Sequence, residues 1–288
     1  ALRRLRFEVA EVEVQSGADI IDWYAGEGAT PDPGPLSWGR PRWFHHWQAE
    51  HRAARENVVL MDMSFMGRFL VQGRDAGRCL NRICTNDVDG EAGRITYTQW
   101  LNAHGLLEGD VTVTKLADDR FLVVVTDTML RHSEAWLRRH IPADAHAFVT
   151  DVSGAHAQLN LQGPRAREVL QTLTSVDLGN AALPFRAARE IDIGYARLLC
   201  VRITYVGELG YELHIPAEQA VHVHEQLVTA GRAFDLRHAG LKALASLRLE
   251  KGYRDYGHDI DNTDDPFEAG LGFSVDLKKP GGFIGREA

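Results

Sequence analysis

Two segments of the chain, about 90 residues apart, follow the same order of local elements. Residues 68–83 (RFLVQGRDAGRCLNRI) and 158–173 (QLNLQGPRAREVLQTL) each predict a strand, a glycine turn and an amphipathic helix. An Ile-Thr-Tyr strand is expected after each segment, at Ile95 and at Ile203. Two similar α+β halves are the simplest explanation, although strand–glycine–helix units are common and the echo is also compatible with chance.

The pattern predicts an α+β fold made of two duplicated halves, each an antiparallel sheet with helices. A hairpin is expected over residues 111–125, where alternating strands flank an Ala-Asp-Asp-Arg turn. We place the first half at residues 51–145 and the second at 146–278. They follow an N-terminal arm over residues 1–50, part of which is rich in glycine and proline.

The chain lacks the fingerprint of a dinucleotide-binding domain. Such a site needs Gly-x-Gly-x-x-Gly directly between a strand and a helix. The nearest match, Gly26-Glu27-Gly28, lies in the proline-rich arm. We therefore expect that this chain alone holds neither flavin nor nicotinamide.

Composition narrows the class of protein further. A length of 288 residues with 44% hydrophobic content is enough for a sizeable core. The net charge of -8 argues against a nucleic-acid surface, and the sequence has no run of about 18 apolar residues that would span a membrane. Three cysteines, an odd and sparse set, fit a reducing compartment. The expected location is the cytoplasm, or the mitochondrial matrix in a eukaryote.

No metal site is expected. The cysteines form no Cys-x-x-Cys pair of the kind that holds structural zinc. His45, His46 and His51 invite a metal interpretation, but their spacings do not put two imidazoles on one helical face.

Asp110 is the first candidate for chemistry. It follows a turn that contains Gly105 and Gly109 and precedes a β run, a position that can aim one carboxylate across the mouth of a cavity. An aspartate at the start of a strand more often bonds to its own turn, so position alone favours a structural role.

Tyr205 and Glu212 lie in a second unusual segment, residues 202–214 (RITYVGELGYELH). Strict alternation would put them on opposite faces of one straight strand. The intervening Val-Gly-Glu-Leu-Gly can turn or bulge, which would let both side chains reach one cavity. A hairpin with a buried tyrosine and a solvated glutamate fits equally well.

These segments resemble the folate-dependent aminomethyltransferase family, which includes the glycine-cleavage T-protein. The family motif Tyr-x-Gly-Glu-x-Gly-[Phe/Tyr]-Glu matches residues 205–212 without a gap. Residues 95–110 (ITYTQWLNAHGLLEGD) match Leu-Asn-x-x-Gly followed by a carboxylate. Leu106 stands where the family usually has a second glycine, so the backbone's approach to a ligand is expected to differ.

The resemblance implies a tetrahydrofolate site. In it, the Asp110 carboxylate lies beside the reacting folate nitrogen. Glu212 accepts the exocyclic NH2 and ring N–H of the pterin as a bidentate pair, and Tyr205 stacks on the ring or hydrogen-bonds to it. Tyr97 matches a family aromatic near the folate and Phe273 one that flanks the ligand tail, and a core role is equally compatible with both.

Two further residues are ambiguous. Arg248 is compatible with a contact to the glutamate tail of folate, but an arginine on a helix more often pairs with a neighbouring acid. Trp100, on the same segment as Tyr97, is expected to pack in the core.

Four segments favour one subgroup of the family, the domain fused behind flavin dehydrogenases of dimethylglycine and sarcosine. They are residues 39–44, 61–73, 247–260 and 265–273. The subgroup implies transfer of a one-carbon unit from an N-methylated amine to tetrahydrofolate, giving 5,10-methylenetetrahydrofolate. The expected partners are a small methylated amine and a flavin dehydrogenase domain or subunit.

Two other functions compete with this interpretation. One is a tetrahydrofolate-dependent demethylase that gives methyltetrahydrofolate. The other is a folate-binding protein without transfer activity, like those that assist iron–sulfur assembly. That group carries a Lys-Gly-Cys-Tyr-x-Gly-Gln-Glu string, which is absent from this sequence.

The likeness runs from about Gly39 to the last residue. Residues 279–288 match the point where relatives enter a further C-terminal β-barrel. We expect that this barrel is missing or truncated here, and that the chain either lacks it or is a fragment of a larger flavoprotein.

Overall fold

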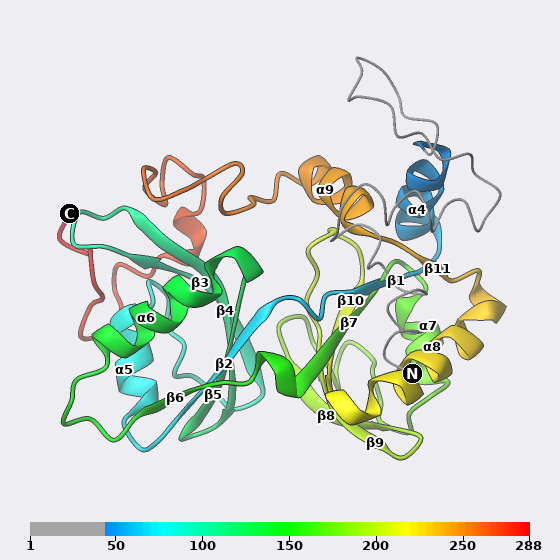
Figure 1. The fold of residues 1–288 in the computed structure, drawn as a ribbon, viewed down its shortest axis with the longest axis horizontal. Helices are drawn as coiled ribbons and strands as arrows, with labels where there is room; N and C mark the ends of the chain where they lie inside the picture. Colours follow the sequence, from blue (N-terminus) through cyan, green and yellow to red (C-terminus); the bar gives the residue numbers. More distant parts are fainter. Residues whose placement is uncertain (1–43) are drawn as a thin grey trace. The chain divides into compact units, whose positions relative to one another are not determined.

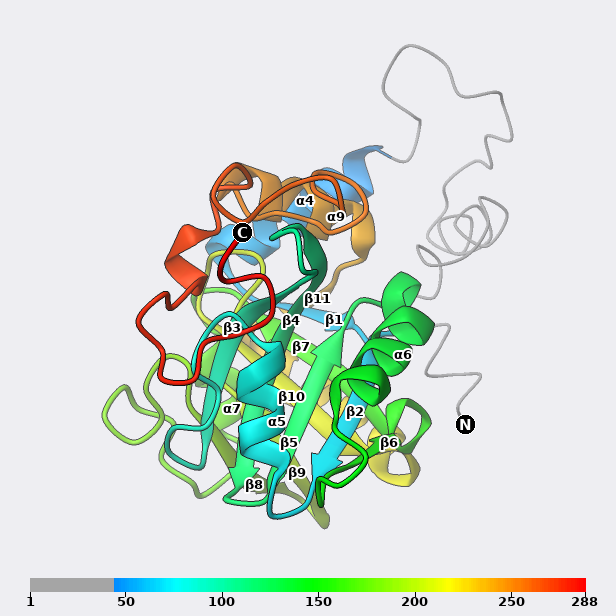
Figure 2. The same cartoon turned by 90° about the vertical axis from the view of Figure 1, so that its left-hand side faces the viewer.

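The computed structural model describes residues 44–288, which pack as two units (Figures 1 and 2). The first unit runs to Ser64 and takes in His156–Phe185 and Glu190–Tyr253. The second unit contains Phe65–Ala155, Arg186–Arg189 and Arg254–Ala288. Each unit is built on its own β-sheet and is described separately.

The first unit holds a six-stranded sheet in the order β11-β1-β7-β10-β9-β8. β1 pairs with β11 in parallel, whereas β7 pairs antiparallel with β1 and β10, and β10 pairs antiparallel with β9. Its elements, in chain order, are α4 (Phe44–Glu56), β1 (Val59–Asp62), β7 (His156–Gln162), α7 (Ala166–Gln171), β8 (Ala188–Ile193), β9 (Ala196–Val201), β10 (Gly210–Pro216), α8 (Ala220–Gly231), β11 (Arg237–His238) and α9 (Leu241–Glu250).

The two faces of the central strands β7 and β10 differ in chemistry. Successive side chains of a strand point to opposite faces, so residues two apart share one face. One face is apolar and fully buried: Leu159, Leu161, Tyr211 and Leu213. The other face is polar yet largely buried: Gln158, Asn160, Gln162, Glu212 and His214. A buried polar face is costly unless its groups find partners, so it marks a candidate site.

The second unit holds a five-stranded antiparallel sheet in the order β3-β4-β5-β2-β6. α5 and α6 pack against this sheet and against each other (Figure 2). Phe69, Trp100, Phe121 and Leu137 are fully buried in the core of this unit. Its elements are β2 (Gly67–Gln72), α5 (Ala76–Ile83), β3 (Arg94–Leu101), β4 (Leu107–Ala117), β5 (Arg120–Val125), α6 (Leu130–His140) and β6 (Phe148–Asp151).

The sequence echo corresponds to two similar local structures. β2, Gly73 and α5 follow each other in the second unit, as β7, Gly163 and α7 do in the first. The two glycines have φ angles of 132° and 125°, which favour glycine over any other residue. An added Cβ would lie 2.1 Å from the His146 carbonyl oxygen at Gly73, and 2.6 Å from the Asn57 carbonyl oxygen at Gly163. In both segments, glycine is therefore required for the same reason: a positive φ and a backbone oxygen too close for a Cβ.

One part of the echo is wrong. Residues 95–97 lie in β3 as expected, but residues 203–205 form no strand. They belong to the loop between β9 and β10, where Thr204 Oγ1 accepts hydrogen bonds from the backbone N–H groups of Val206 and Gly207. The side chain thereby competes with ladder formation and closes a turn.

The packing units do not follow the contiguous ranges expected from the sequence. Residues 59–62 form β1, which pairs with β7 and β11 and so joins strands far along the chain. Val59, Leu60 and Met61 are buried there, and this burial draws the start of the described chain into the later sheet. Whether the two units arose by duplication stays a proposal.

The two ends also differ from expectation. Residues 44–50 belong to α4, not to an arm, and residues 1–43 lie outside the described residues. Residues 279–288 pack into the second unit. Lys279 Nζ donates to the backbone oxygens of Asn81 at 2.7 Å and Asn86 at 3.0 Å, and Phe283 is buried.

Candidate functional site

In the second unit, Gln99 and Asp110 lie directly opposite each other on β3 and β4. The Gln99 side-chain nitrogen Nε2 donates to Asp110 Oδ1 at 2.9 Å. Gln99 has no exposed surface, whereas Asp110 keeps part of its surface accessible. The strand ladder thus holds one carboxylate at a defined place, with Oδ1 engaged by Gln99.

The neighbouring pair explains this orientation. Trp100 lies opposite Gly109, and its fully buried indole donates to Cys84 Sγ at 3.3 Å. A Cβ on Gly109 would lie 2.9 Å from the Trp100 ring, so the ring packs flat only because that position has no side chain. The expected core role of Trp100 is confirmed. Since faces alternate, Trp100 in the core turns Gln99 and Asp110 to the other face.

The environment makes Asp110 a weak acid. Burial raises its pKa to about 6, hydrogen bonds from Tyr97 and Gln99 oppose that rise, and the negative charge of Asp255 adds to it. A carboxyl group with a pKa near 6 is largely ionised at neutral pH and still accepts a proton readily. Asp110 therefore has the properties of a general base.

Tyr97 and Phe273 lie together in the same unit. Their rings stack with centroids 6.0 Å apart and an angle of 25° between their planes. Tyr97 is partly buried, whereas Phe273, in the short helical turn Gly272–Ser274, is 77% exposed. A large aromatic ring left this exposed has surface to offer a ligand, which argues against the core role for Phe273.

In the first unit, Glu212 lies directly opposite Asn160, on β10 and β7. Asn160 Nδ2 is 3.5 Å from Glu212 Oε1, and Gln158 Nε2 donates to Asn160 Oδ1 at 3.2 Å. His214 Nε2 lies 3.8 Å from Glu212 Oε2. The carboxylate is the centre of a polar network that is mostly buried, and its own side chain is 14% exposed.

Gln162 lies on the same face of β7 as Gln158 and Asn160 and was not anticipated from the sequence. It is 1% exposed, and neither its Nε2 nor its Oε1 has a hydrogen-bond partner. Gly210 lies directly opposite, where a Cβ would fall 1.9 Å from Gln162 Oε1. A buried amide left unpaired is costly, which points to a ligand or water as its partner. The sequence pattern that could have revealed Gln162 is three side-chain amides at alternate positions of one strand, 158, 160 and 162.

Tyr205 lies in the loop between β9 and β10. Its ring stacks on Tyr253 with centroids 6.0 Å apart. The loop is anchored by Arg55, which donates to the Val206 carbonyl oxygen and forms an ion pair with Glu208 at 3.1 Å. The turn that the glycines of this segment suggested is present, because Gly207 adopts a φ of 75°.

Arg248 contacts the turn that follows its own helix. It is 8% exposed on α9, and its Nη1 donates to the backbone oxygen of Tyr253 at 3.0 Å. The Tyr253 N–H donates back to the Arg248 carbonyl oxygen. This pair closes the turn after α9, which favours a structural role over a contact with a ligand tail.

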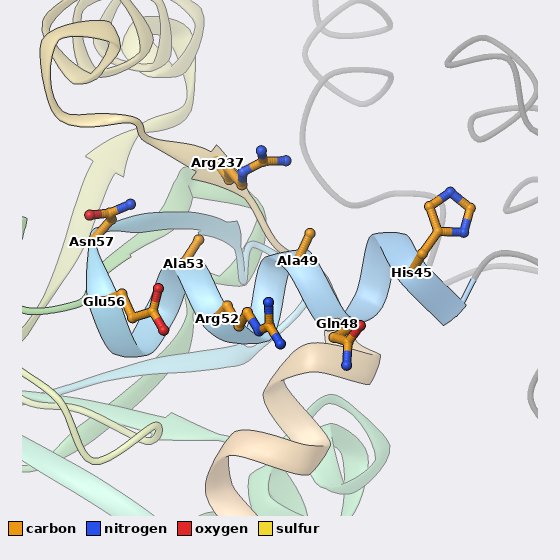
Figure 3. A pocket seen from close by; sticks show the side chains of 8 residues that line it. All are labelled: His45, Gln48, Ala49, Arg52, Ala53, Glu56, Asn57 and Arg237. Carbon is orange, nitrogen blue, oxygen red and sulfur yellow. The ribbon is translucent and has the colours of Figure 1, made fainter.

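A hollow of about 360 Å³ lies along α4 and contains none of the expected site residues. It is lined by His45, Gln48, Arg52, Glu56 and Arg237, among others (Figure 3). In Figure 3, Arg237 lies on one side of the helix and Gln48 and Glu56 extend toward the other, so these groups do not converge on one point.

Within residues 44–288, no three His, Cys, Asp or Glu side chains gather in a way that could hold a metal ion. His51 instead contacts Ser246 Oγ at 2.8 Å through Nδ1 and Glu250 at 3.2 Å through Nε2. In the same part of the chain, no helix has the length and apolarity needed to cross a bilayer.

Comparison with known proteins places this fold. Residues 10–279 match the model of the GCVT N-terminal domain. The glycine cleavage system aminomethyltransferase T of Bartonella henselae has a similar structure, with a TM-score of 0.75 and 27% identity, over 92% of this chain and 72% of that one. The fold is thus that of an aminomethyltransferase domain.

Curated relatives are larger proteins. The chain is 40% identical over 273 residues to 4-methylaminobutanoate oxidase (formaldehyde-forming) of Paenarthrobacter nicotinovorans. It is 33% identical over 264 residues to mitochondrial sarcosine dehydrogenase of Mus musculus. These matches cover 95% and 86% of this chain but only 33% and 28% of the relatives. The chain belongs to the aminomethyltransferase (GCVT) family, as the sequence motifs indicated, and its relatives include proteins named as a 4-methylaminobutanoate oxidase and a sarcosine dehydrogenase.

Proposed function

We propose that this chain transfers a one-carbon unit from the oxidation product of an N-methylated amine to tetrahydrofolate, giving 5,10-methylenetetrahydrofolate. The observation that carries the proposal is Asp110, a carboxylate held by Gln99 with a pKa raised to about 6. The family match supports the transferase class. The relative named as formaldehyde-forming supports a carbon at the oxidation level of formaldehyde, which is also the level of the methylene group in the product.

The polar face of the first unit suits the edge of a pterin. That edge presents an exocyclic NH2 and a ring N–H side by side, together with a carbonyl oxygen. Glu212 can accept the two N–H groups, and the orphaned Gln162 amide offers both a donor and an acceptor. Asn160, beside Glu212, keeps that carboxylate oriented. These residues are therefore proposed to bind the folate.

Asp110 is proposed as the base. Two nitrogens of tetrahydrofolate form the two new bonds to the one-carbon unit, and the demethylated amine of an imine donor, or water from formaldehyde, leaves. One of these nitrogens is a secondary aryl amine, which becomes strongly acidic as its bond forms. Asp110 accepts the proton that this nitrogen loses, and its own raised pKa favours that acceptance. Phe273 and Tyr97 offer an aromatic surface in the same unit.

The donor side of the reaction is proposed from the relatives. Their names specify 4-methylaminobutanoate and sarcosine, which are both N-methylated amino acids. Oxidation of such an amine requires a flavin or similar oxidant, and the sequence of this chain shows no dinucleotide fingerprint. We propose a flavin dehydrogenase domain or subunit as the partner that supplies the oxidised donor.

The test is the rate of methylenetetrahydrofolate formation above the protein-free rate, with formaldehyde or an oxidised methylamine as donor. Asp110→Asn keeps the shape of the side chain and removes the base. The rate should fall by about 10² to 10⁴ while folate affinity changes little. Asp119→Asn, an exposed aspartate in the β4–β5 turn, is the matched control and should behave like the wild type. Equal rates for Asp110→Asn and the wild type would refute the proposal, and methyltetrahydrofolate as the product would favour the demethylase.

A further inference from the structure

Gln99 forms hydrogen bonds through both ends of its side chain. Its Nε2 donates to Asp110 Oδ1 at 2.9 Å, and its Oε1 accepts from the hydroxyl of Ser274. Both Gln99 and Ser274 are almost completely buried, at 0% and 1% exposure. The chain of contacts Ser274–Gln99–Asp110 thus starts in the interior and ends at the one accessible member.

Chemistry permits only one orientation of the Gln99 amide. An ionised carboxylate accepts hydrogen bonds and cannot donate them, so the NH2 end of Gln99 must face Asp110. The carbonyl end then faces the Ser274 hydroxyl, whose single proton has two acceptors, Gln99 Oε1 and the Leu271 carbonyl oxygen at 2.6 Å. Rotating the amide by half a turn would place its carbonyl oxygen against the carboxylate, which is repulsive.

Ser274 is held in turn by its own surroundings. Its backbone N–H donates to the Leu271 carbonyl oxygen at 2.9 Å, and its carbonyl oxygen accepts from Thr85 Oγ1 at 3.0 Å. Thr85 Oγ1 also accepts from the backbone N–H of Gln99 at 3.1 Å. Gln99, Ser274 and Thr85 thus form a closed, buried network of hydrogen bonds. The network holds Gln99 through its backbone N–H as well as through its side chain.

We propose that Gln99 is a positioning residue, anchored by Ser274, that holds the Asp110 carboxylate in the orientation needed for proton transfer. This inference rests on the proposed function of Asp110 as the base. Gln99 has no exposed surface and acts through Asp110, so it is expected to change the rate of turnover and not the affinity for folate.

The first test needs no turnover. Carboxyl ¹³C NMR, with Asp110 assigned by comparison with Asp110→Asn, follows the titration of Asp110 in the wild type and in Gln99→Met. The variant keeps the length of the side chain but has no N–H to stabilise the ionised carboxylate, so the titration midpoint should rise by about one pH unit. Ser274→Ala leaves Gln99 in place but unanchored and should move the midpoint in the same direction by less. Ser133→Ala removes an equally buried serine hydroxyl elsewhere in the unit and should not move it.

The second test uses turnover. In Gln99→Met the acidic limb of the kcat–pH profile should shift to higher pH by about one unit. At pH 7, kcat should fall roughly tenfold with the folate KM unchanged, about twofold from the smaller ionised fraction of Asp110 and the rest from its lost orientation. Gln99→Met changes a buried side chain and could impair folding. Ser274→Ala removes only one oxygen atom, so it tests the same network with less risk to the fold. An unchanged midpoint and unchanged profile in both variants would overturn the positioning role. Absence of turnover by the wild type, with the midpoint shifted as expected, would instead overturn the proposed function alone.

Discussion

Asn160 and Glu212 lie directly opposite each other on two antiparallel strands, with the asparagine nitrogen 3.5 Å from a carboxylate oxygen. Gln99 and Asp110 have the same relationship in the other unit, at 2.9 Å. In both pairs a carboxamide, which can donate, faces a carboxylate, which accepts when ionised. Each unit therefore has a carboxylate on its sheet that a carboxamide on the neighbouring strand orients, and the tighter pair belongs to the proposed base.

Glu212 should contribute strongly to folate affinity. Glu212→Gln replaces a charged acceptor of two hydrogen bonds with a neutral amide, a loss of about 1.5–3 kcal/mol or roughly 10- to 100-fold in Kd. Titration calorimetry with folinic acid measures this, with Glu225→Gln on the exposed side of α8 as the control. If Glu212→Gln binds folinic acid as tightly as the wild type, Glu212 has no place in the binding site.

Asn160→Leu tests the orienting contact separately. The leucine fills a similar volume but cannot donate to Glu212, so the carboxylate loses a partner while keeping its charge. We expect a weakening of folinic acid binding of about threefold to tenfold, smaller than for Glu212→Gln, in line with a long hydrogen bond. A loss as large as that of Glu212→Gln would mean that Asn160 itself contacts the ligand.

Asp110 should make the protein less stable as the pH rises. Its folded-state pKa of about 6 exceeds the ordinary value of 3.8, so between these values the folded protein binds a proton that the unfolded chain has lost. The free energy of unfolding contributed by this group therefore falls between about pH 4 and pH 6, by at most about 3 kcal/mol, and stays low above that range.

Asp110→Asn removes this pH dependence, since asparagine does not ionise. Urea denaturation should show the variant more stable than the wild type at pH 7.5, with the difference shrinking toward zero near pH 4. Asp119→Asn provides the comparison, because its exposed side chain should leave the difference constant across this range. A constant difference for Asp110→Asn as well would show that the carboxylate is not destabilised by burial.

Gly73 and Gly163 should be intolerant of alanine. Each has a positive φ and a backbone oxygen within 2.6 Å of the position of a Cβ, so alanine strains the backbone and collides with the main chain. We expect each substitution to lower the free energy of unfolding by roughly 2 kcal/mol or more. Gly154→Ala is the control, because no heavy atom lies within 4 Å of its added Cβ. Thermal denaturation that gave the same midpoint for all three variants would contradict the steric argument.

The sequence by itself determined the local elements and the family. The strand–glycine–helix units at 68–83 and 158–173 follow from hydrophobic periodicity and from two glycines at positions where the backbone has a positive φ. Asp110, Tyr205 and Glu212 were recognisable because each lies in a family motif that is a contiguous string, at residues 95–110 and 205–212. Such features depend on residues close together in the chain.

Only the tertiary structure decided which strands are neighbours and which side chains meet. Periodicity assigns a residue to a face, but the register between strands is set by long-range pairing and packing. Gln99 meets Asp110 across 11 residues, Asn160 meets Glu212 across 52, and Ser274 meets Gln99 across 175. The same long-range pairing carried β1 into the later sheet, because burial of β1 outweighed the local pattern. Residues 203–205 form a loop for a local reason that periodicity does not show, the turn closed by the Thr204 side chain.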